Sequence, residues 1–315
     1  MRPPTGTGRV VCLPALRARR LHDRGDDQRR WRHGVLKRAE TPISRETRIM
    51  RIGWIGLGQI GTPMVLRIRA AGHEVIGHSR RDDGRESLRA AGVTLTRSLV
   101  ETARGADMLG VAVFDDAQLR EVLLGPEGVL AAMQPGAVVF THTTGSPRLA
   151  EEIARRAPPG VEFLDACFSG TAQQASEGRL TLMVGGSNEA LERARPVIGT
   201  YGGNIVHAGP VGMGQRMKLL NNILFGAHTL LAMEAVNIAE RQGLPRHVLV
   251  PALMASSGAS YALNMFGGAA TPAQLFEGLR KYIDKDVEVA RESARDAGID
   301  LGRLAAATTE FTLRR

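Results

Sequence analysis

Residues 50–64 read Met-Arg-Ile-Gly-Trp-Ile-Gly-Leu-Gly-Gln-Ile-Gly-Thr-Pro-Met, an apolar run that leads into a glycine turn of the form G-x-G-x-x-G. The pattern predicts a strand, a tight turn and a helix that ends near Gly72. In such a turn one glycine permits the bend, the second lets the backbone approach a pyrophosphate, and the third lets helix and strand pack closely. The stretch therefore predicts a dinucleotide-binding turn made of Gly56, Leu57, Gly58, Gln59, Ile60 and Gly61.

The second apolar run, residues 74–77, predicts a second strand, and the residues after it bear on the choice of cofactor. An NAD site usually carries an acidic residue there, which accepts a hydrogen bond from the ribose 2′-hydroxyl. This chain has Ser79, Arg80 and Arg81, followed by Asp82 and Asp83. Two arginines beside a serine favour a 2′-phosphate, so we expect NADP. NAD is the alternative, if the arginines are solvated loop residues and Asp82 turns inward.

Short apolar runs alternate with helix-compatible stretches from Met50 to about Gly209. This alternation predicts an α/β fold of the Rossmann type, with a doubly wound and mostly parallel sheet. The candidate strands are residues 51–55, 74–77, 108–113, 138–141, 162–165, 180–184 and 204–207. The candidate helices include residues 117–124 and 147–157.

After Gly214 the pattern becomes helical. Residues 215–242 are continuously helix-compatible, Gly243 is a natural stop, and Pro245 opens another helix. We expect an NADP-binding domain over 50–212 and an all-helical domain over 213–315. The long apolar-rich helix favours a homodimer or homotetramer, and packing within the same chain is the alternative.

The chain has 37 arginines and four lysines, so a lysine in the fold is a distinctive choice. Its amine can give and take a proton, whereas a guanidinium stays charged. Lys218 and Asn222 stand four residues apart after the turn at Gly212, and therefore share one helix face. They suit an acid/base pair that acts on an oxygen-bearing substrate. Taken alone, they also fit a surface helix with an ordinary lysine.

Most of the net charge of +9 lies near the N-terminus, because residues 1–49 hold 13 basic and five acidic residues. Residues 50–315 hold 28 basic and 27 acidic residues, so we expect no nucleic-acid partner. We expect 1–49 to be a disordered extension from a misassigned start, with a transit peptide as the alternative. Two cysteines give no disulfide framework and no metal site. No apolar run approaches a membrane span, and we expect a cytoplasmic protein.

A glycine-dense, loop-like stretch follows the strand at 162–165. Within it, Ser169 and the amides of Gly170 and Thr171 could hold a carboxylate. A tight turn without a ligand is the alternative. The stretch favours a small-molecule carboxylate as substrate.

Four segments occur in an order that resembles the β-hydroxyacid dehydrogenase family, which includes 3-hydroxyisobutyrate dehydrogenases and tartronate semialdehyde reductases. They are GLGQIGTPM at 56–64, DACFSG with A-x-x-G-x-L-x-x-M-x-G-G over 165–186, GMGQRMKLLNN at 212–222, and KDVEVA at 285–290. Residues 113–123 and 143–147 are also similar to family segments. The resemblance covers nearly all of residues 50–300, and the ordered set is specific.

The resemblance implies a role for each matching position. Lys218 gives a proton to the carbonyl oxygen in reduction and takes it back in oxidation, and Asn222 orients the substrate. Ser169 and Gly170, with Thr171, form the carboxylate-binding turn. The resemblance places four residues beside the cofactor: Val113, Phe114, Thr144 and Lys285.

Several positions depart from the family pattern. Cys167 and Phe168 replace a proline and a valine, Thr171 replaces a second glycine, and Phe114 stands where proline is common. These changes predict a reshaped pocket with intact chemistry. The chain also stops before helices that help to close the family's active site.

Together the patterns predict an NADP(H)-dependent oxidoreductase that transfers a hydride between nicotinamide and a 3-hydroxy acid or its semialdehyde. One alternative is an imine reductase of the same architecture, although those enzymes generally carry another residue in place of Lys218. The other alternative is a non-catalytic NADP-binding protein.

Overall fold

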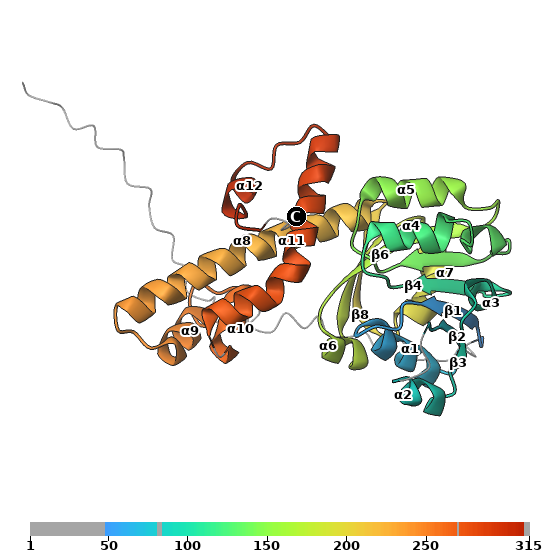
Figure 1. Ribbon diagram of the computed structural model, residues 1–315, viewed down its shortest axis with the longest axis horizontal. Coiled ribbons are helices and arrows are strands. Elements are labelled where there is room, and N and C mark those ends of the chain that lie inside the picture. Colours follow the sequence, from blue (N-terminus) through green and yellow to red (C-terminus); the bar gives the residue numbers. More distant parts are fainter. Residues whose placement is uncertain (1–47, 81–83, 270, 312–315) are drawn as a thin grey trace, which may run out of the picture. The chain divides into compact units, whose positions relative to one another are not determined.

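The computed structural model describes residues 48–80, 84–269 and 271–311 (Figure 1). The predicted extension at 1–49 falls outside this range except for its last two residues, and Arg81, Asp82 and Asp83 fall outside it as well. The described residues belong to one compact unit. The division of this unit into two domains after residue 212 stays a prediction.

One sheet runs through the first part of the described chain, with the strand order β3-β2-β1-β4-β5-β6-β7-β8. Neighbouring strands are parallel except for β6 and β7, which are antiparallel. The predicted Rossmann-type, mostly parallel sheet is therefore confirmed. Its strands are β1 (Arg51–Ile55), β2 (Glu74–His78), β3 (Thr94–Thr96), β4 (Met108–Val111), β5 (Val138–Thr141), β6 (Glu162–Ser169), β7 (Leu180–Gly185) and β8 (Gly202–Gly209).

Helices cover both faces of this sheet (Figure 1). One face packs against α1 (Gly61–Ala70), α2 (Glu86–Ala90), α6 (Ala172–Ser176) and α7 (Asn188–Ile198). The other face packs against α3 (Leu99–Ala103), α4 (Asp116–Leu124), the 3₁₀ turn η1 (Leu130–Ala132) and α5 (Pro147–Arg156).

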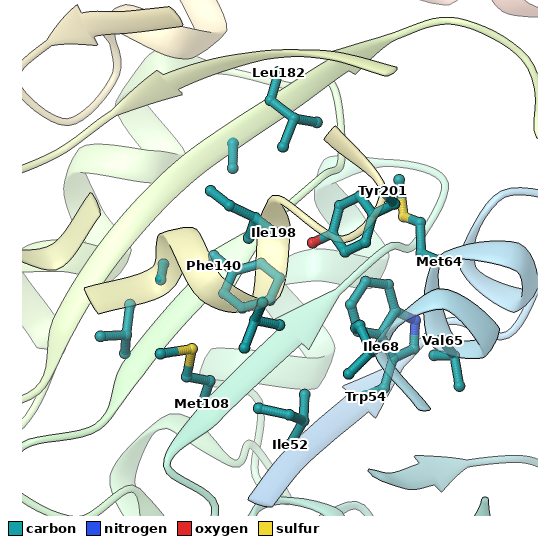
Figure 2. Close-up of a cluster of buried hydrophobic side chains, with 14 of the residues drawn as sticks. Ile52, Trp54, Met64, Val65, Ile68, Met108, Phe140, Leu182, Ile198 and Tyr201 are labelled. Carbon is teal, nitrogen blue, oxygen red and sulfur yellow. The ribbon is translucent and has the colours of Figure 1, made fainter. Parts of the chain in front are cut away.

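Trp54 of β1 is the largest side chain of the first face, and it is fully buried. Its ring packs edge-on against Phe140 and Tyr201, with centroid distances of 6.0 and 6.2 Å, as Figure 2 shows. A Cβ added to Gly110 on β4 would lie 2.5 Å from this ring. The glycine in β4 is thus required because the indole occupies the space beside it.

The second part of the described chain is helical, as predicted. It consists of α8 (Met213–Arg241), α9 (Arg246–Met254), α10 (Tyr261–Gly268), α11 (Pro272–Asp296) and α12 (Arg303–Ala307). Leu219 and Ile223 of α8 pack against Ile283 and Val287 of α11. The remainder of α8 packs against α9 and α10. The single long helix predicted over 215–242 is therefore confirmed. It begins two residues earlier, at Met213, and ends at Arg241.

Three local predictions were wrong. The strand expected at 108–113 ends at Val111, and the short β3 was not anticipated because two of its three residues are threonines. The stretch expected to be loop-like is mostly regular, since β6 continues to Ser169 and pairs with β7 in the register Ser169↔Thr181. A hairpin partner thus extends a strand whose own sequence looks irregular after Asp165.

The statement that no apolar run approaches a membrane span was also wrong. By length and composition alone, α8 is long and apolar enough to cross a membrane. Residues along its whole length, from Gly214 to Ala239, are buried against other elements of the chain. Core helices of globular proteins have this composition because packing, like a bilayer, selects apolar side chains.

Candidate functional site

A cavity of 1690 Å³ lies between the sheet and the helices α8, α10 and α11. Its walls include the first glycine turn, the residues that follow β2, β4 and β5, and the end of β6. Ligands of doubly wound sheets bind at the carboxyl ends of the strands, which is where this cavity lies. Every predicted site residue within the described range lines it.

The glycine turn between β1 and α1 has the backbone that its sequence predicts. Gly56 adopts a φ of 102°, a left-handed conformation that favours glycine. A Cβ on Gly61 would collide with the carbonyl oxygen of Gly56, so this position keeps helix and strand in close contact. A Cβ on Gly58 would meet no atom within 4 Å. Gly58 therefore presents bare backbone to open space, which fits the approach of a pyrophosphate.

The residues after β2 place a hydroxyl and two arginines at the cavity wall. Ser79 is buried, and its Oγ accepts a hydrogen bond from Arg85 Nε at 3.3 Å. Arg85 Nη1 also donates to the carbonyl oxygen of Leu57 at 2.6 Å, and Arg80 is exposed at the same wall. The sequence prediction named Ser79, Arg80 and Arg81 but missed Arg85.

Asp165, in the middle of β6, fixes the beginning of α8. Its two carboxylate oxygens accept hydrogen bonds from the backbone N–H groups of Gly212 at 2.8 Å and Gln215 at 2.7 Å. Burial raises the pKa of this carboxyl group to about 6, while the two N–H donors act against that rise. A Cβ on Gly214 would collide with the carbonyl oxygen of Asp165. The helix can therefore begin directly against the strand.

Gln215 ties the same helix to the turn after β5. The side chain is 1% exposed. Its Nε2 donates to the carbonyl oxygen of Thr143 at 2.8 Å, and its Oε1 accepts from the backbone N–H of Gly145 at 2.9 Å. Both the donor nitrogen and the acceptor oxygen of the side-chain amide are therefore hydrogen-bonded within the protein. Asp165 and Gln215 together position α8 relative to the ends of β5 and β6.

Lys218 projects from this fixed first part of α8 into the cavity and is 9% exposed. Its Nζ lies 5.9 Å from the centre of the Phe168 ring. Burial lowers the pKa of the amine, and the negative charge of Asp286 partly opposes this effect. A lowered pKa brings the neutral amine closer to physiological pH, which is the condition for proton exchange by a lysine.

Asn222 lies one helical turn after Lys218, and its side-chain amide contacts other protein groups. Its Nδ2 donates to Asp286 of α11, and its Oδ1 accepts from Asn221 Nδ2 at 2.8 Å. Asp286 is 7% exposed and also pairs with Lys285 Nζ at 2.7 Å. The predicted substrate-orienting amide is therefore held by an aspartate that the sequence prediction missed. Its place directly after Lys285 in the KDVEVA segment was the available signal.

Lys285 contacts two of the other residues that are predicted to lie beside the cofactor, Thr144 and Phe114. Its Nζ donates to the carbonyl oxygen of Thr144 at 2.7 Å and lies 5.6 Å from the centre of the Phe114 ring. The neighbouring Val113 accepts a hydrogen bond from Thr143 Oγ1 at 2.9 Å. A lysine from α11 thus reaches the two loops that follow β4 and β5.

The turn that is predicted to hold a carboxylate has a left-handed glycine at Gly170 and one change in its hydrogen bonding. Gly170 has a φ of 138°, and Ser169 is half-buried at the cavity. Thr171, however, forms a capping box with Gln174: its backbone N–H donates to Gln174 Oε1 at 2.9 Å. Of the two amides expected to hold a carboxylate, the one at Thr171 is therefore used to begin α6. Ser169 Oγ and the amide of Gly170 remain for a ligand.

A buried histidine at the end of β5 was also missed. His142 Nδ1 lies 2.5 Å from the carbonyl oxygen of Ala166, and Nε2 lies 2.9 Å from the Tyr201 hydroxyl. A ring that donates from Nδ1 to the carbonyl and accepts from the hydroxyl at Nε2 is neutral. Burial lowers the pKa of His142 to about 4. This neutral bridge joins β5 to β6 directly before Phe168 and Ser169.

Comparison with known families agrees with this geometry. Residues 51–209 match the NAD-binding domain of 6-phosphogluconate dehydrogenase. Residues 212–313 match a second family model, which is described as NAD-binding of NADP-dependent 3-hydroxyisobutyrate dehydrogenase. The chain is 33% identical over 254 residues to an NAD-dependent L-serine dehydrogenase of Pseudomonas aeruginosa, covering 78% of this chain and 85% of that protein.

Solved structures give the same result. A Mycobacterium tuberculosis 3-hydroxyisobutyrate dehydrogenase with L-serine superposes with a TM-score of 0.74 at 27% identity, covering 84% of this chain and 92% of that one. An imine reductase of Streptomyces aurantiacus, with a TM-score of 0.58 at 20% identity, covers 83% of this chain and 93% of that one and shares the fold.

The chain belongs to the β-hydroxyacid dehydrogenase family. It is an NAD(P)-dependent oxidoreductase that acts on CH–OH groups.

Proposed function

We propose that the protein is an NADP(H)-dependent dehydrogenase of 3-hydroxy acids, or in the reverse direction a reductase of their semialdehydes, with Lys218 as general acid and base. The observation that carries this proposal is the position of Lys218, which is 9% exposed and whose amine has its pKa lowered by burial. It lies in the cavity that the glycine turn and the Ser169–Gly170 turn also line.

When bound, the nicotinamide cofactor supplies the hydride acceptor or donor. In oxidation neutral Lys218 would take the hydroxyl proton as the carbonyl forms, and the hydride of the carbinol carbon would go to the bound nicotinamide. In reduction the protonated amine returns that proton to the carbonyl oxygen. Ser169 and Gly170 hold the substrate carboxylate, and Asn222, oriented by Asp286, contacts the reacting oxygen. Fixed positions supply the orientational advantage of such a site.

The preference for NADP rests on the wall after β2. Arg80 and Arg85 line the cavity with Ser79, and a 2′-phosphate would receive charge-assisted hydrogen bonds from guanidinium groups. In the described wall Arg85 already connects Ser79 to the glycine turn. Asp82 and Asp83, which could accept a hydrogen bond from the ribose 2′-hydroxyl of NAD, lie outside the described range.

The homodimer or homotetramer also stays a proposal, supported by the exposed apolar side chains of α8. Leu220 is 57%, Leu231 is 63% and Ile238 is 41% exposed. Leu224 is exposed on this helix and lines the cavity, so a second copy packed there would cover one side of it. Light scattering on the purified chain measures this directly. The cytoplasmic location and the lack of a nucleic-acid partner remain predictions.

The test is NADPH oxidation with a panel of small aldehyde acids, with NADH in parallel and Lys218→Ala beside the native chain. We expect turnover with at least one aldehyde acid, a preference for NADPH, and loss of turnover in the variant. Tight NADPH binding without turnover of any aldehyde or 3-hydroxy acid would contradict the enzymatic role. A preference for NADH would contradict the cofactor proposal alone.

A further inference from the structure

The cavity continues past Lys218 along α8 and becomes apolar. Phe225 lies seven residues after Lys218 and therefore on the same helix face. Three helices contribute the side chains of this part, which we call the apolar end: Leu224, Phe225, Tyr261, Met265, Leu279 and Ile283. The rings of Phe225 and Tyr261 are 6.1 Å apart.

The apolar end offers no charge to a ligand, as far as the described side chains show. The charged groups nearest to it on the helices are Lys218, Lys285 and Asp286. Lys285 and Asp286 pair with each other at 2.7 Å. Asn221, Asn222, His228 and Tyr282 are polar side chains of α8 and α11 that also line the cavity. A second carboxylate or an ammonium group bound there would lose its water without gaining a partner, which is costly.

Apolar and aromatic surface at this end is nevertheless accessible to solvent. Tyr261 is 60% exposed and Leu224 is 46% exposed. A concave apolar surface beside a few convergent polar groups is the usual form of a small-molecule site. The polar groups here are those of the proposed reacting centre, which fixes the orientation of any substrate that reaches this surface.

Phe168 and Arg179 line the cavity on the sheet side of the reacting centre. The Phe168 ring lies beside Lys218, and Phe168 pairs with Leu182 in the hairpin β6–β7. Arg179, the cation at that side of the cavity, forms an ion pair with Glu177. With the carboxylate at Ser169 and the hydroxyl at Lys218, the apolar end is the part of the cavity lining that suits an apolar substituent.

We propose that the substrate is a 3-hydroxy acid, or its semialdehyde, whose second carbon carries a bulky apolar group, aliphatic or aromatic. The group binds among Phe225, Tyr261 and Met265 while the carboxylate binds at Ser169 and Gly170. This inference rests on the proposed function and adds the substrate class. It separates this chain from relatives that act on small polar substrates, because Phe168 and the apolar end select by size and polarity.

The first experiment measures kcat/KM for oxidation with NADP⁺ across a series of 3-hydroxypropanoates. The substituents at carbon 2 are hydrogen, methyl, butyl, benzyl and carboxyethyl, and L-serine is included. Burial of each methylene is expected to raise kcat/KM about fourfold, so the butyl substrate should exceed the methyl one by about 60-fold. The carboxyethyl substrate and L-serine should be poorer than the methyl substrate.

The second experiment compares Phe225→Ala and Met265→Ala with the matched control Val248→Ala. Val248 is an apolar residue of α9, is 49% exposed and does not line the cavity. We expect the butyl-to-methyl ratio to fall about tenfold in the first two variants. The ratio should stay at the native value in the control. Light scattering on the same samples shows whether the oligomeric state has changed.

The outcomes separate this inference from the proposed function. Turnover with no dependence on the substituent, or with the carboxyethyl substrate preferred, overturns the apolar site and leaves the dehydrogenase standing. A changed oligomeric state in Phe225→Ala with an unchanged ratio assigns the surface to a second copy and also overturns it. If no substrate turns over, the proposed function fails. The affinity of the NADPH complex for 3-phenylpropanoate then tests whether the apolar end binds an apolar group. Equal affinity of the native chain and Phe225→Ala would then overturn it.

Discussion

The two walls of the cavity are built on different principles. The sheet wall, at the ends of β1, β2 and β5, presents backbone groups and glycines. The helix wall, on α8 and α11, presents the head groups of Lys218, Asn222, Lys285 and Asp286. On the sheet wall the absence of a side chain is what matters, as at Gly58 and Gly61. On the helix wall the identity of each head group matters, because a proton must be held and released.

This difference teaches that binding and chemistry can be damaged separately. Changes at Lys218 and Asn222 on the helix wall should remove turnover and leave the dinucleotide site intact, whereas Lys285 of the same wall lies beside the predicted cofactor residues Phe114 and Thr144. Changes on the sheet wall should affect cofactor binding or the stability of the fold. The following variants test that division, beginning with the largest expected effect.

Lys218→Arg keeps a positive charge on the helix wall but removes a titratable amine. A guanidinium cannot release its proton near neutral pH, so it cannot act as a base in oxidation. We expect kcat to fall by about 10³-fold, within the range of general acid–base catalysis. Stopped-flow measurement of NADPH formation reports this rate. A variant that keeps a tenth of the native rate would show that charge alone is sufficient, and the proton role would be wrong.

His142→Gln tests the buried bridge of the sheet wall. A glutamine can donate to Ala166 and accept from Tyr201 without titrating. In the native chain the pKa of His142 is depressed from 6.5 to about 4, so the unfolded state binds the extra proton first as the pH falls. Native stability is therefore complete above pH 6.5 and should drop by about 3 kcal/mol between pH 6.5 and pH 4.

Urea unfolding of both chains at a series of pH values measures this effect as a difference. Asp165, with its raised pKa, contributes with the opposite sign between pH 4 and pH 6, but it is common to both chains and cancels. A constant difference in the free energy of unfolding across this range would mean that His142 does not titrate as its burial requires.

Gly61→Ala and Gly58→Ala form a matched pair within one turn. The methyl group at position 61 would collide with a backbone oxygen, so we expect a loss of about 1–3 kcal/mol of stability. At position 58 it would enter open space, so the melting temperature should stay close to that of the native chain. NADPH binding should instead weaken about tenfold. Thermal melts with and without NADPH compare the two, and equal melting temperatures for both variants would refute this account of the turn.

Asp286→Asn tests the electrostatics of the helix wall and should have the smallest effect. The negative charge of Asp286 raises the pKa of Lys218 against the larger effect of burial. Its removal should lower that pKa further. Oxidation needs the neutral amine, so kcat/KM rises with pH, and its inflection should move to lower pH by roughly one unit.

The control for this variant is Asp284→Asn, on the same helix. Asp284 is also buried, but it pairs with Arg280 at 3.3 Å and does not face Lys218. Its pH profile should match that of the native chain. A shift of the inflection to higher pH in Asp286→Asn would contradict the assigned interaction.

The glycine turn of the sheet wall could be predicted from the sequence, whereas Arg85 and His142 of the same wall and Asp286 of the helix wall could not. Gly56, Gly58 and Gly61 lie within six residues, so local spacing fixes their geometry. Lys218 and Asn222 share a helix face for the same reason. The contact between Asn222 and Asp286 spans 64 residues and depends on how α11 packs against α8. Spacing along the chain carries no information about such a contact.

Most of the errors have the same origin, and the exception is Thr171. The strand β6 runs on past Asp165 because β7 pairs with it, and no pattern within 166–169 announces that partner. The amide of Thr171 is used by Gln174, although T-x-x-Q is a readable capping signal. This capping signal implies that only Ser169 and Gly170 of the predicted turn are available to hold a carboxylate. Arg85 and His142 reach their partners only through the tertiary fold.

The most direct test of the division between the two walls is NADPH titration of Lys218→Ala and Gly58→Ala, followed by nucleotide fluorescence, beside turnover measurements on the same samples. The account predicts that Lys218→Ala binds NADPH within threefold of the native affinity while its turnover is lost. It predicts at least tenfold weaker binding for Gly58→Ala. If Lys218→Ala loses NADPH affinity as strongly as it loses turnover, the helix wall holds the cofactor and the separation of binding from chemistry is wrong.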